Sequence, residues 1–332
     1  MNYYLRRTLR IPLTILAVAT LTFGLIRLLP GGPFTQLRIQ LIRQGVPVEQ
    51  VNARIEELQS IRPDAPLWQQ YIDYIIGVVQ LDLGRSISLE QPVVEVLARA
   101  LPWTVFLVVT STILMFVIGV LIGAVQAYWE GSKFDKIMSS GSIFLMSVPY
   151  YIFAVLALFV LAFQLGWFPT GNAAARSVEA GFTIEYITSV LHHAALPIAA
   201  FTIGGIGSTA LNMRGNGIQV LGEEYVEVAR LRGLSNSRIS TRYVAKNAIL
   251  PMYTGLLLQI GFRLGGTVVL EEIFSYPGLG YYLIEAVNAN DYPLMMGCFL
   301  IITVTLVVAV YVADMTYGLI DPRISAGDSD GY

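Results

Sequence analysis

The residue types that most often carry chemistry in proteins are few in this sequence of 332 residues, and their spacing fits few reactions. A phosphate-binding loop needs Gly-Lys-Ser/Thr, whereas the three lysines follow Ser132, Asp135 and Ala245. The two histidines, His192 and His193, are adjacent and therefore point to different sides of a helix. We therefore predict no ATP hydrolysis by this chain and no metal site.

Nucleophilic and redox chemistry also lack the residues they need. The sequence has one cysteine, Cys298, which excludes an intrachain disulfide and a zinc cluster built on several cysteines. No Gly-x-Ser-x-Gly nucleophile motif is present. These observations predict a chain that is not an enzyme and has no cofactor of its own.

An amphipathic segment at residues 221–233 is the first pattern that indicates a function. Its apolar residues recur at the helical spacing i, i+4, i+7 and i+10: Leu221, Tyr225, Val228 and Leu231. Acidic residues gather at its start, and Arg230 and Arg232 lie near its end, which complements the helix dipole. Gly233 can supply the left-handed residue that ends a helix. The acidic start matches anionic lipids poorly, so the pattern favours docking to a protein over lying on a membrane surface.

Arg263 is the second notable residue, because it lies inside an apolar stretch at residues 249–270. An arginine near the middle of a membrane costs about 2.5 kcal/mol or more unless it faces a polar cavity or a partner. One interpretation places Arg263 on a translocation path, with Gln259 one turn away on the same face and Glu271 beyond the stretch. The other is a buried interhelical hydrogen bond, for example to a carbonyl freed near Gly265.

The elements that must position these residues are apolar. Hydrophobic residues make up 55% of the chain, charged residues only 13%, and the mean hydropathy is +0.62. Soluble domains carry about 25% charged residues, so the composition excludes a cytosolic enzyme. The net charge of −2 provides no electrostatic footprint for nucleic acid.

Six stretches approach the roughly 20 apolar residues that a membrane-spanning helix needs. They lie at residues 11–29, 101–128, 137–165, 192–213, 249–270 and 294–319, and the fourth is the least apolar. The first could be read as a cleaved signal peptide, but it is long for one and Arg27-Leu28-Leu29-Pro30 follows it instead of a small-residue cleavage site. The sequence therefore predicts an all-α integral membrane protein with six transmembrane helices.

Three polar segments interrupt the predicted spans. The segment 31–100 is predicted to be a mostly helical extracytoplasmic insert, and a shorter external loop covers residues 166–190. The long cytoplasmic segment 214–247 contains the amphipathic pattern. The predicted organisation is therefore: 1–30, N-terminal tail and first span; 31–100, insert; 101–320, five-helix core that includes 214–247; and 321–332, C-terminal tail.

Proline and basic residues refine the predicted spans. The pairs Leu101-Pro102, Leu196-Pro197 and Leu250-Pro251 are expected to lie at helix starts, where proline is tolerated. With the N-terminus inside, 12 of the 21 lysines and arginines fall on the cytoplasmic side, including all three lysines. Both termini are therefore predicted to be cytoplasmic, in a cell membrane.

The stretch from Glu227 to Gly233, Glu-Val-Ala-Arg-Leu-Arg-Gly, resembles the EAA motif of ATP-binding-cassette importer permeases. Val228 replaces the first alanine of that motif, and Arg232 stands where lysine is usual. Other segments resemble the dipeptide and oligopeptide permease family, in the expected order: Arg27–Gly31, Asp82–Ser86, Gly131-Ser132 with Asp135, residues 271–280, Asp291-Tyr292-Pro293 and Asp321-Pro322-Arg323. The insert and six spans fit the "B" type of permease subunit, although residues 36–66 match no motif.

This resemblance implies a type I ABC importer permease fold and half of a translocation pathway for peptides or a related solute. It implies a second homologous permease subunit in the lipid bilayer, two ABC ATPase subunits that bind ATP and Mg, and an extracytoplasmic substrate-binding protein. The expected ATPase-coupling residues are Tyr225, Glu227, Ala229, Arg230, Arg232 and Gly233. The turn containing Pro277, Gly278 and Gly280 would form part of an external gate.

Two other classes of membrane protein, ion-coupled secondary transporters and channel subunits, fit the sequence less well. An ion-coupled secondary transporter would need acidic residues near the span centres, which the sequence lacks. A channel subunit would need a selectivity filter, and none stands out. The sequence therefore favours an importer permease over both.

Overall fold

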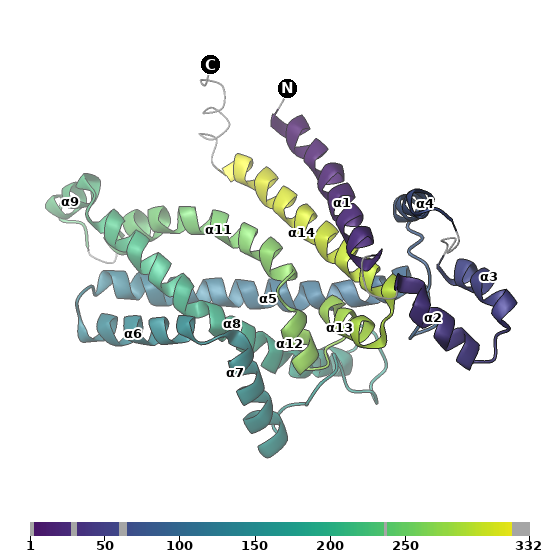
Figure 1. Cartoon of the computed structure of the whole chain (residues 1–332). Helices are drawn as coiled ribbons and strands as arrows, with labels where there is room; N and C mark the ends of the chain where they lie inside the picture. The colour runs from purple at the N-terminus through teal and green to yellow at the C-terminus, as the bar shows by residue number, and fades with distance from the viewer. Residues whose placement is uncertain (1–2, 28–31, 60–64, 236–237, 321–332) are drawn as a thin grey trace. The chain divides into compact units, whose positions relative to one another are not determined.

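The computed structural model of the chain describes residues 3–27, 32–59, 65–235 and 238–320, and this part is helical (Figure 1). The helices are Tyr3–Arg27 (α1), Gly32–Arg43 (α2), Val48–Gln59 (α3), Leu67–Gln80 (α4), Val93–Tyr128 (α5), Lys133–Ser147 (α6), Tyr150–Ala157 (α7), Ile184–Leu221 (α8), Glu224–Leu231 (α9), Lys246–Leu264 (α11), Val268–Ile273 (α12), Leu279–Ala289 (α13) and Tyr292–Ile320 (α14). Two π-helical segments, Leu158–Gln164 (η1) and Ile239–Ala245 (η2), follow α7 and precede α11. The described residues contain no β-strand, which confirms the all-α prediction.

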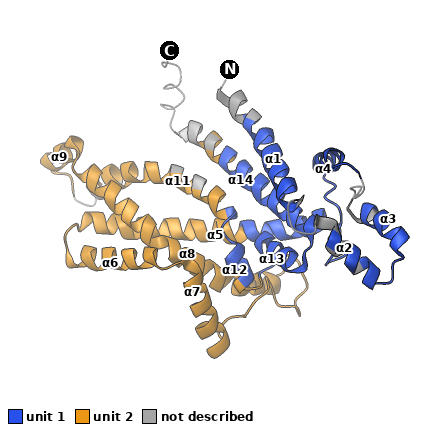
Figure 2. Cartoon of the chain, in the orientation of Figure 1, with its two compact units in different colours: residues 1–105, 264–272, 276–311 blue, residues 106–263, 273–275, 312–332 orange. Residues whose placement is uncertain are grey.

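The chain forms two compact units (Figure 2). Unit 1 comprises residues 1–105, 264–272 and 276–311, and unit 2 comprises residues 106–263, 273–275 and 312–332. Unit 1 therefore combines the predicted first span and insert with parts of the predicted core at residues 101–320. The predicted tail at residues 321–332, with Asp321-Pro322-Arg323, and most of the Arg27–Gly31 stretch lie outside the described residues.

In unit 1, the segment predicted as an insert is helical and packs against the first and last long helices. Its helices α2, α3 and α4 share a core with α1 and α14. Phe23 of α1 stacks on Tyr74 of α4 and meets the Tyr71 ring edge-on. The Thr20 and Tyr71 hydroxyls form a hydrogen bond of 2.7 Å. Aromatic contacts therefore fix α4 against α1.

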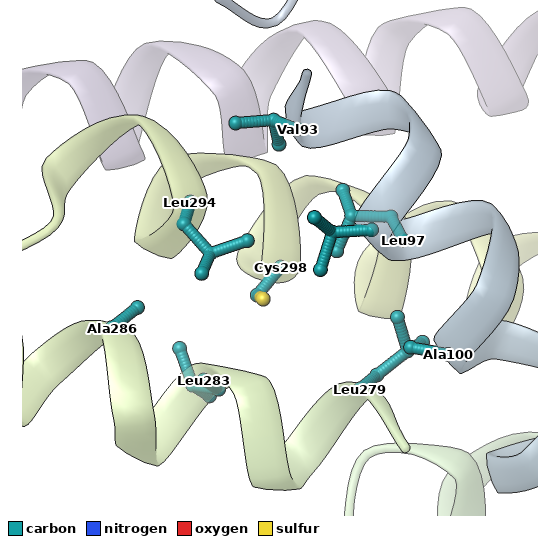
Figure 3. Packing of buried hydrophobic residues seen from close by; sticks show 9 residues of the cluster. Val93, Leu97, Ala100, Leu279, Leu283, Ala286, Leu294 and Cys298 are labelled. Carbon is teal, nitrogen blue, oxygen red and sulfur yellow. The ribbon is translucent and has the colours of Figure 1, made fainter. Parts of the chain in front are cut away.

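A second core of unit 1 lies where α5, α13 and α14 meet (Figure 3). Buried side chains from the three helices point toward the thiol of Cys298: Val93, Leu97, Ala100, Leu279, Leu283, Ala286 and Leu294. The small residues at this meeting point let the helices approach closely, as in other membrane helix packings. The single cysteine is therefore a buried packing residue.

In unit 2, α8 packs closely against α5, α6 and α7 through glycine. A Cβ on Gly207 would collide with the backbone carbonyl of Ser142 in α6. A Cβ on Gly123 of α5 would likewise collide with the carbonyl of Ala210 in α8. A Cβ on Gly217 would lie 2.6 Å from that of Ala127. Helix α8 contains the least apolar of the predicted spans, and its glycines let its backbone pack directly against the neighbouring helices.

The predicted count of six membrane spans is not confirmed. Among the described residues, α5, α8 and residues 292–313 of α14 are long and apolar enough to cross a membrane. The predicted third span instead consists of α6 and the α7–η1 helix, bent by 89° at Val148-Pro149, and would make a fourth if counted as one span. The bend has a local cause, because proline cannot donate the hydrogen bond that would continue α6. Helix α1 contains a shorter apolar part, Arg10–Ile26, and α11 falls short of the criterion.

The predicted helix starts at the Leu-Pro pairs are wrong. Pro102, Pro197 and Pro251 lie inside α5, α8 and α11. Helix α5 begins at Val93, because Val93 and Leu97 bury an apolar face ahead of the proline. Neighbouring helices can satisfy the backbone groups that a proline frees in a membrane helix. Tertiary packing therefore extends these helices backward past the proline.

Glycine packing predicts a position-specific response to alanine. Gly207→Ala should lower the thermal stability of the purified protein by about 1–3 kcal/mol, because the added methyl overlaps the Ser142 carbonyl. Gly215→Ala is the matched control on the same helix, because no described atom lies within 4 Å of its Cβ position. Thermal unfolding in detergent measures both. Equal stability of the two variants would contradict the close approach of α6 and α8.

Candidate functional site

The predicted amphipathic segment forms a short, separate helix in unit 2. Helix α8 ends at Leu221, Gly222 and Glu223 break the chain, and α9 runs from Glu224 to Leu231. Figure 1 shows α9 beyond the end of α8, in the part of unit 2 that leads into α11. The single helix predicted over 221–233 is therefore two helices, since Leu221 belongs to α8.

The apolar stripe predicted on this segment faces outward. Tyr225, Val228 and Leu231 are 41%, 52% and 82% exposed. The buried face of α9 is instead made by Val226 and Ala229, which pack against Ile239 and Val244 of η2. An exposed apolar face on a charged helix fits the predicted docking role.

Ala229 needs a correction. It is only 3% exposed and belongs to the core between α9 and η2. Its side chain therefore holds α9 in place and is not available to touch a partner. Sequence reasoning missed Val226, although its spacing of i, i+3 to Ala229 indicates a second apolar face.

The end of α9 has the predicted geometry. Gly233 has φ +73°, the left-handed conformation that suits glycine. The Gly233 N–H donates to the Arg230 carbonyl, and the Leu234 N–H donates to the Ala229 carbonyl at 3.3 Å. The Asn247 amide donates to the Tyr225 hydroxyl at 3.1 Å. Helix α9 is thus held to η2 by its core face and to α11 by its tyrosine, while Glu227, Arg230 and Arg232 stay exposed.

A buried ion pair joins α6 to α8 in unit 2. The Arg214 guanidinium donates through Nε and Nη2 to the two carboxylate oxygens of Asp135, at 2.6 and 2.8 Å. Asp135 also accepts the Gly131 N–H at 3.0 Å and the Ser139 hydroxyl at 3.2 Å, and Gln126 donates to Ser139. The Arg214 hydrogen bonds hold the pKa of the Asp135 carboxyl well below its usual range. The pair therefore stays ionised across physiological pH and locks α8 near its end to the turn before α6.

Arg263, near the C-terminal end of α11, lies against α8. Its guanidinium stacks on the Phe201 ring, 4.7 Å from the ring centre. Phe201 in turn meets the Tyr150 ring edge-on at 5.1 Å. Gln259, predicted to share this face, is exposed. Within unit 2, Arg263 makes no hydrogen bond or ion pair with a described residue. The carbonyl predicted near Gly265 belongs to unit 1, so that bond stays a prediction.

Glu271 occupies a fully buried position in unit 1. Its carboxylate accepts the Thr267 hydroxyl at 3.0 Å and the N–H groups of Gly280 and Tyr281 at 2.7 and 3.3 Å. The last two groups belong to the first turn of α13, where a helix N-terminus favours negative charge. Glu271 is therefore the anchor of a tight turn, and the predicted pathway-lining role does not fit its buried geometry.

The predicted turn at residues 277–280 is shorter than expected. Gly278 precedes α13, and Leu279 and Gly280 already belong to that helix. A Cβ on Gly278 would collide with Glu271 and one on Gly280 with the Val268 backbone, so both glycines are needed for the close approach. The Leu279 N–H donates to the Thr104 hydroxyl of α5 at 2.8 Å. These contacts hold α5, α12 and α13 together in a rigid cluster.

Asp291 is a key residue that sequence reasoning did not single out as a site. Its fully buried carboxylate accepts the Ser86 hydroxyl at 2.6 Å, the Ser88 hydroxyl and N–H at 2.8 and 2.9 Å, and the Leu294 N–H at 3.1 Å. Two motifs noted separately in the sequence, Asp82–Ser86 and Asp291-Tyr292-Pro293, therefore meet at one carboxylate. The only available signal was that both resemble motifs of the same family.

Long apolar helices and a short amphipathic helix with an exposed apolar face define a helical membrane protein. The family comparison agrees: residues 115–326 match the binding-protein-dependent transport system inner membrane component family. The chain belongs to that family.

Full-length relatives give the same result. The chain is 31% identical to the oligopeptide transport system permease protein AppB of Bacillus subtilis (strain 168), over 97% of this chain and 98% of the relative. It is 31% identical to the dipeptide transport system permease protein DppB of the same organism, over 97% of each. It is also 31% identical to the glutathione transport system permease protein GsiC of Salmonella choleraesuis (strain SC-B67), over 98% and 99%. The described chain is thus similar to permease subunits along nearly its whole length.

The ion pair predicts a specific pattern in a double-mutant cycle. Arg214→Ala should destabilise the protein by about 3 kcal/mol or more, because it leaves the buried Asp135 carboxylate without its partner. Asp135→Ala alone should cost less, because the Arg214 side chain is 28% exposed. The double variant should lose clearly less than the sum, since neither charge is then left alone. Thermal unfolding of the four proteins in detergent measures the coupling. Strictly additive losses would show that the pair does not bind α6 to α8.

Proposed function

We propose that this chain is one of two homologous transmembrane subunits of an ATP-driven importer for peptides or a related solute. The observation that carries the proposal is the outward face of α9, where Tyr225, Val228 and Leu231 are exposed beside charged side chains. Apolar side chains exposed to water do not stabilise the subunit by itself, whereas a groove in a partner protein would bury them. The names of the relatives, which refer to oligopeptide, dipeptide and glutathione transport, support the solute class.

In this proposal α9 docks onto one of two ABC ATPase subunits, which bind ATP and Mg. Val226 and Ala229 hold the helix to its own chain, so a movement of the ATPase is passed to η2 and α11. Gly233 fixes the turn, and the Asp135–Arg214 pair ties the end of α8 to α6. The load is therefore shared by three helices of unit 2 instead of bending a single loop.

The remaining assignments extend the same proposal. Both termini and α9 face the cytoplasm, and residues 31–100 face the outside, where a substrate-binding protein delivers the solute. The rigid cluster around Glu271, Gly278 and Gly280 forms part of the external gate, which is therefore not a flexible loop. The chain itself hydrolyses nothing.

Substitutions on the exposed face of α9 should uncouple transport without unfolding the subunit. Leu231→Asp and Glu227→Arg should each lower ATP-dependent uptake at least about tenfold, because both side chains are exposed and, in this proposal, face the ATPase. Uptake into proteoliposomes and co-purification of the ATPases measure the effect. Arg232→Lys keeps the charge and serves as the control with near-normal uptake. Normal uptake by Leu231→Asp would argue against docking through this face.

Gly233 provides an independent test of the turn. Gly233→Pro should abolish coupling, because proline fixes φ near −65° and the native φ is +73°. Gly233→Asn should retain most of the uptake, because asparagine tolerates the left-handed conformation better than other side chains. The ratio of uptake to ATP hydrolysis reports coupling. If the proline variant transports normally, the turn does not transmit force.

A further inference from the structure

Arg263 is a half-buried cation, and the helices that it contacts in unit 2 place no acidic residue beside it. It lies in α11, and its described contacts are with α8 and with the residues that pack on α8. The helices α5, α7, α8 and α11 together contain two acidic residues, Glu95 and Glu185, each in the first turn of its helix. Glu185 precedes Phe201 by 16 residues, which is about 24 Å along a helix. Glu185 therefore cannot neutralise Arg263, and Glu95 belongs to unit 1.

The surroundings of Arg263 hold its guanidinium in one orientation. The guanidinium carbon lies over the Phe201 ring, and Phe201 makes a T-shaped contact with Tyr150. One helical turn after Phe201, Gly205 leaves the space that the guanidinium occupies. A Cβ there would lie 2.6 Å from Nη2 of Arg263 and would also collide with the Met115 sulfur. The site that holds the guanidinium is thus formed by the Phe201 ring, by Gly205, which has no side chain, and by Met115.

A contact between a guanidinium and an aromatic ring satisfies none of the N–H donors along the edge of the guanidinium. That edge carries five N–H donors in a rigid fork, which matches the two oxygens of a carboxylate. Among the described residues none of these donors meets an acceptor, although an unpaired charge within a membrane is costly. A polar group on the neighbouring face of α5 is also unused: the buried Ser111 hydroxyl, one turn before Met115, has no hydrogen-bond partner among the described residues. The geometry therefore suits an anion that arrives and leaves.

We propose that Arg263 is a substrate-contacting residue that binds a carboxylate of the transported solute as it passes through the membrane. The inference rests on the proposed transport function and names the chemical class of solute: one with a free carboxylate, such as the C-terminus of a peptide. Phe201 and Gly205 act as positioning residues that present the edge of the guanidinium. The passing carboxylate supplies the counter-charge that the helices around Arg263 do not place beside it.

The test compares a free acid with its amide. The assembled transporter, with its ATPases and binding protein in proteoliposomes, is given trialanine and trialanine C-terminal amide. Arg263→Gln should lower uptake of the free acid by about tenfold to a hundredfold, the usual range for a lost charged hydrogen bond. It should leave any amide uptake nearly unchanged, because the amide has no charge to lose. The same binding protein is present throughout, so its own preference cancels in the comparison of variant with wild type.

Arg263→Lys separates a role of the charge from a role in packing. Lysine keeps a cation but not the fork, so it should restore at least part of the free-acid uptake that Arg263→Gln loses. Equal loss of acid and amide uptake in Arg263→Gln, or no recovery with lysine, would overturn the inference in favour of a packing role or a carboxylate from another subunit. Unchanged free-acid uptake in Arg263→Gln would overturn it as well. Failure of the wild-type complex to take up either peptide with ATP would instead refute the proposed function for peptides, and the inference with it.

Discussion

The close approach of α8 to its neighbours is the constraint on which the rest of unit 2 depends. Gly207 and Gly217 let the backbone of α8 lie against α6 and α5, where any side chain would collide. Without a hydrophobic driving force between helices in lipid, such packing contacts are a main source of association. The Asp135–Arg214 pair closes one end of this contact, and the guanidinium of Arg263 lies against its middle. Helix α9 begins where α8 ends, so its position follows from the same packing.

Much of this arrangement could be predicted from the sequence, because periodicity and composition are local properties. Apolar composition indicated the helical membrane class, and the glycine at position 233 indicated the end of α9 correctly. The periodicity also identified Tyr225, Val228 and Leu231 as one apolar stripe, although periodicity alone cannot say whether a stripe faces inward or outward. For the same reason Ala229 was assigned to the partner-facing side when it belongs to the core.

The residues that escaped prediction depend on contacts between distant parts of the chain. Asp291 accepts hydrogen bonds from residues more than 200 positions earlier, and no local pattern announces such a pairing. Glu271 looked like a pathway residue because its partners, the backbone N–H groups of the α13 start, have no sequence signature. The bend at Val148-Pro149 and the continuation of α5 past Pro102 show the same limit. Whether a proline ends a helix depends on the packing around it, which the local sequence does not contain.

Helix α9 has two faces with separate duties, and this separation has an evolutionary consequence. The inner face, Val226 and Ala229, is satisfied by η2 of the same chain, so the helix is already folded before any partner arrives. Binding then pays little ordering entropy. The outer face is free of structural duty and can vary without disturbing the fold. If α9 docks on an ATPase as proposed, duplicated transporters can diverge in their choice of ATPase through this outer face, while the membrane-embedded part is inherited intact.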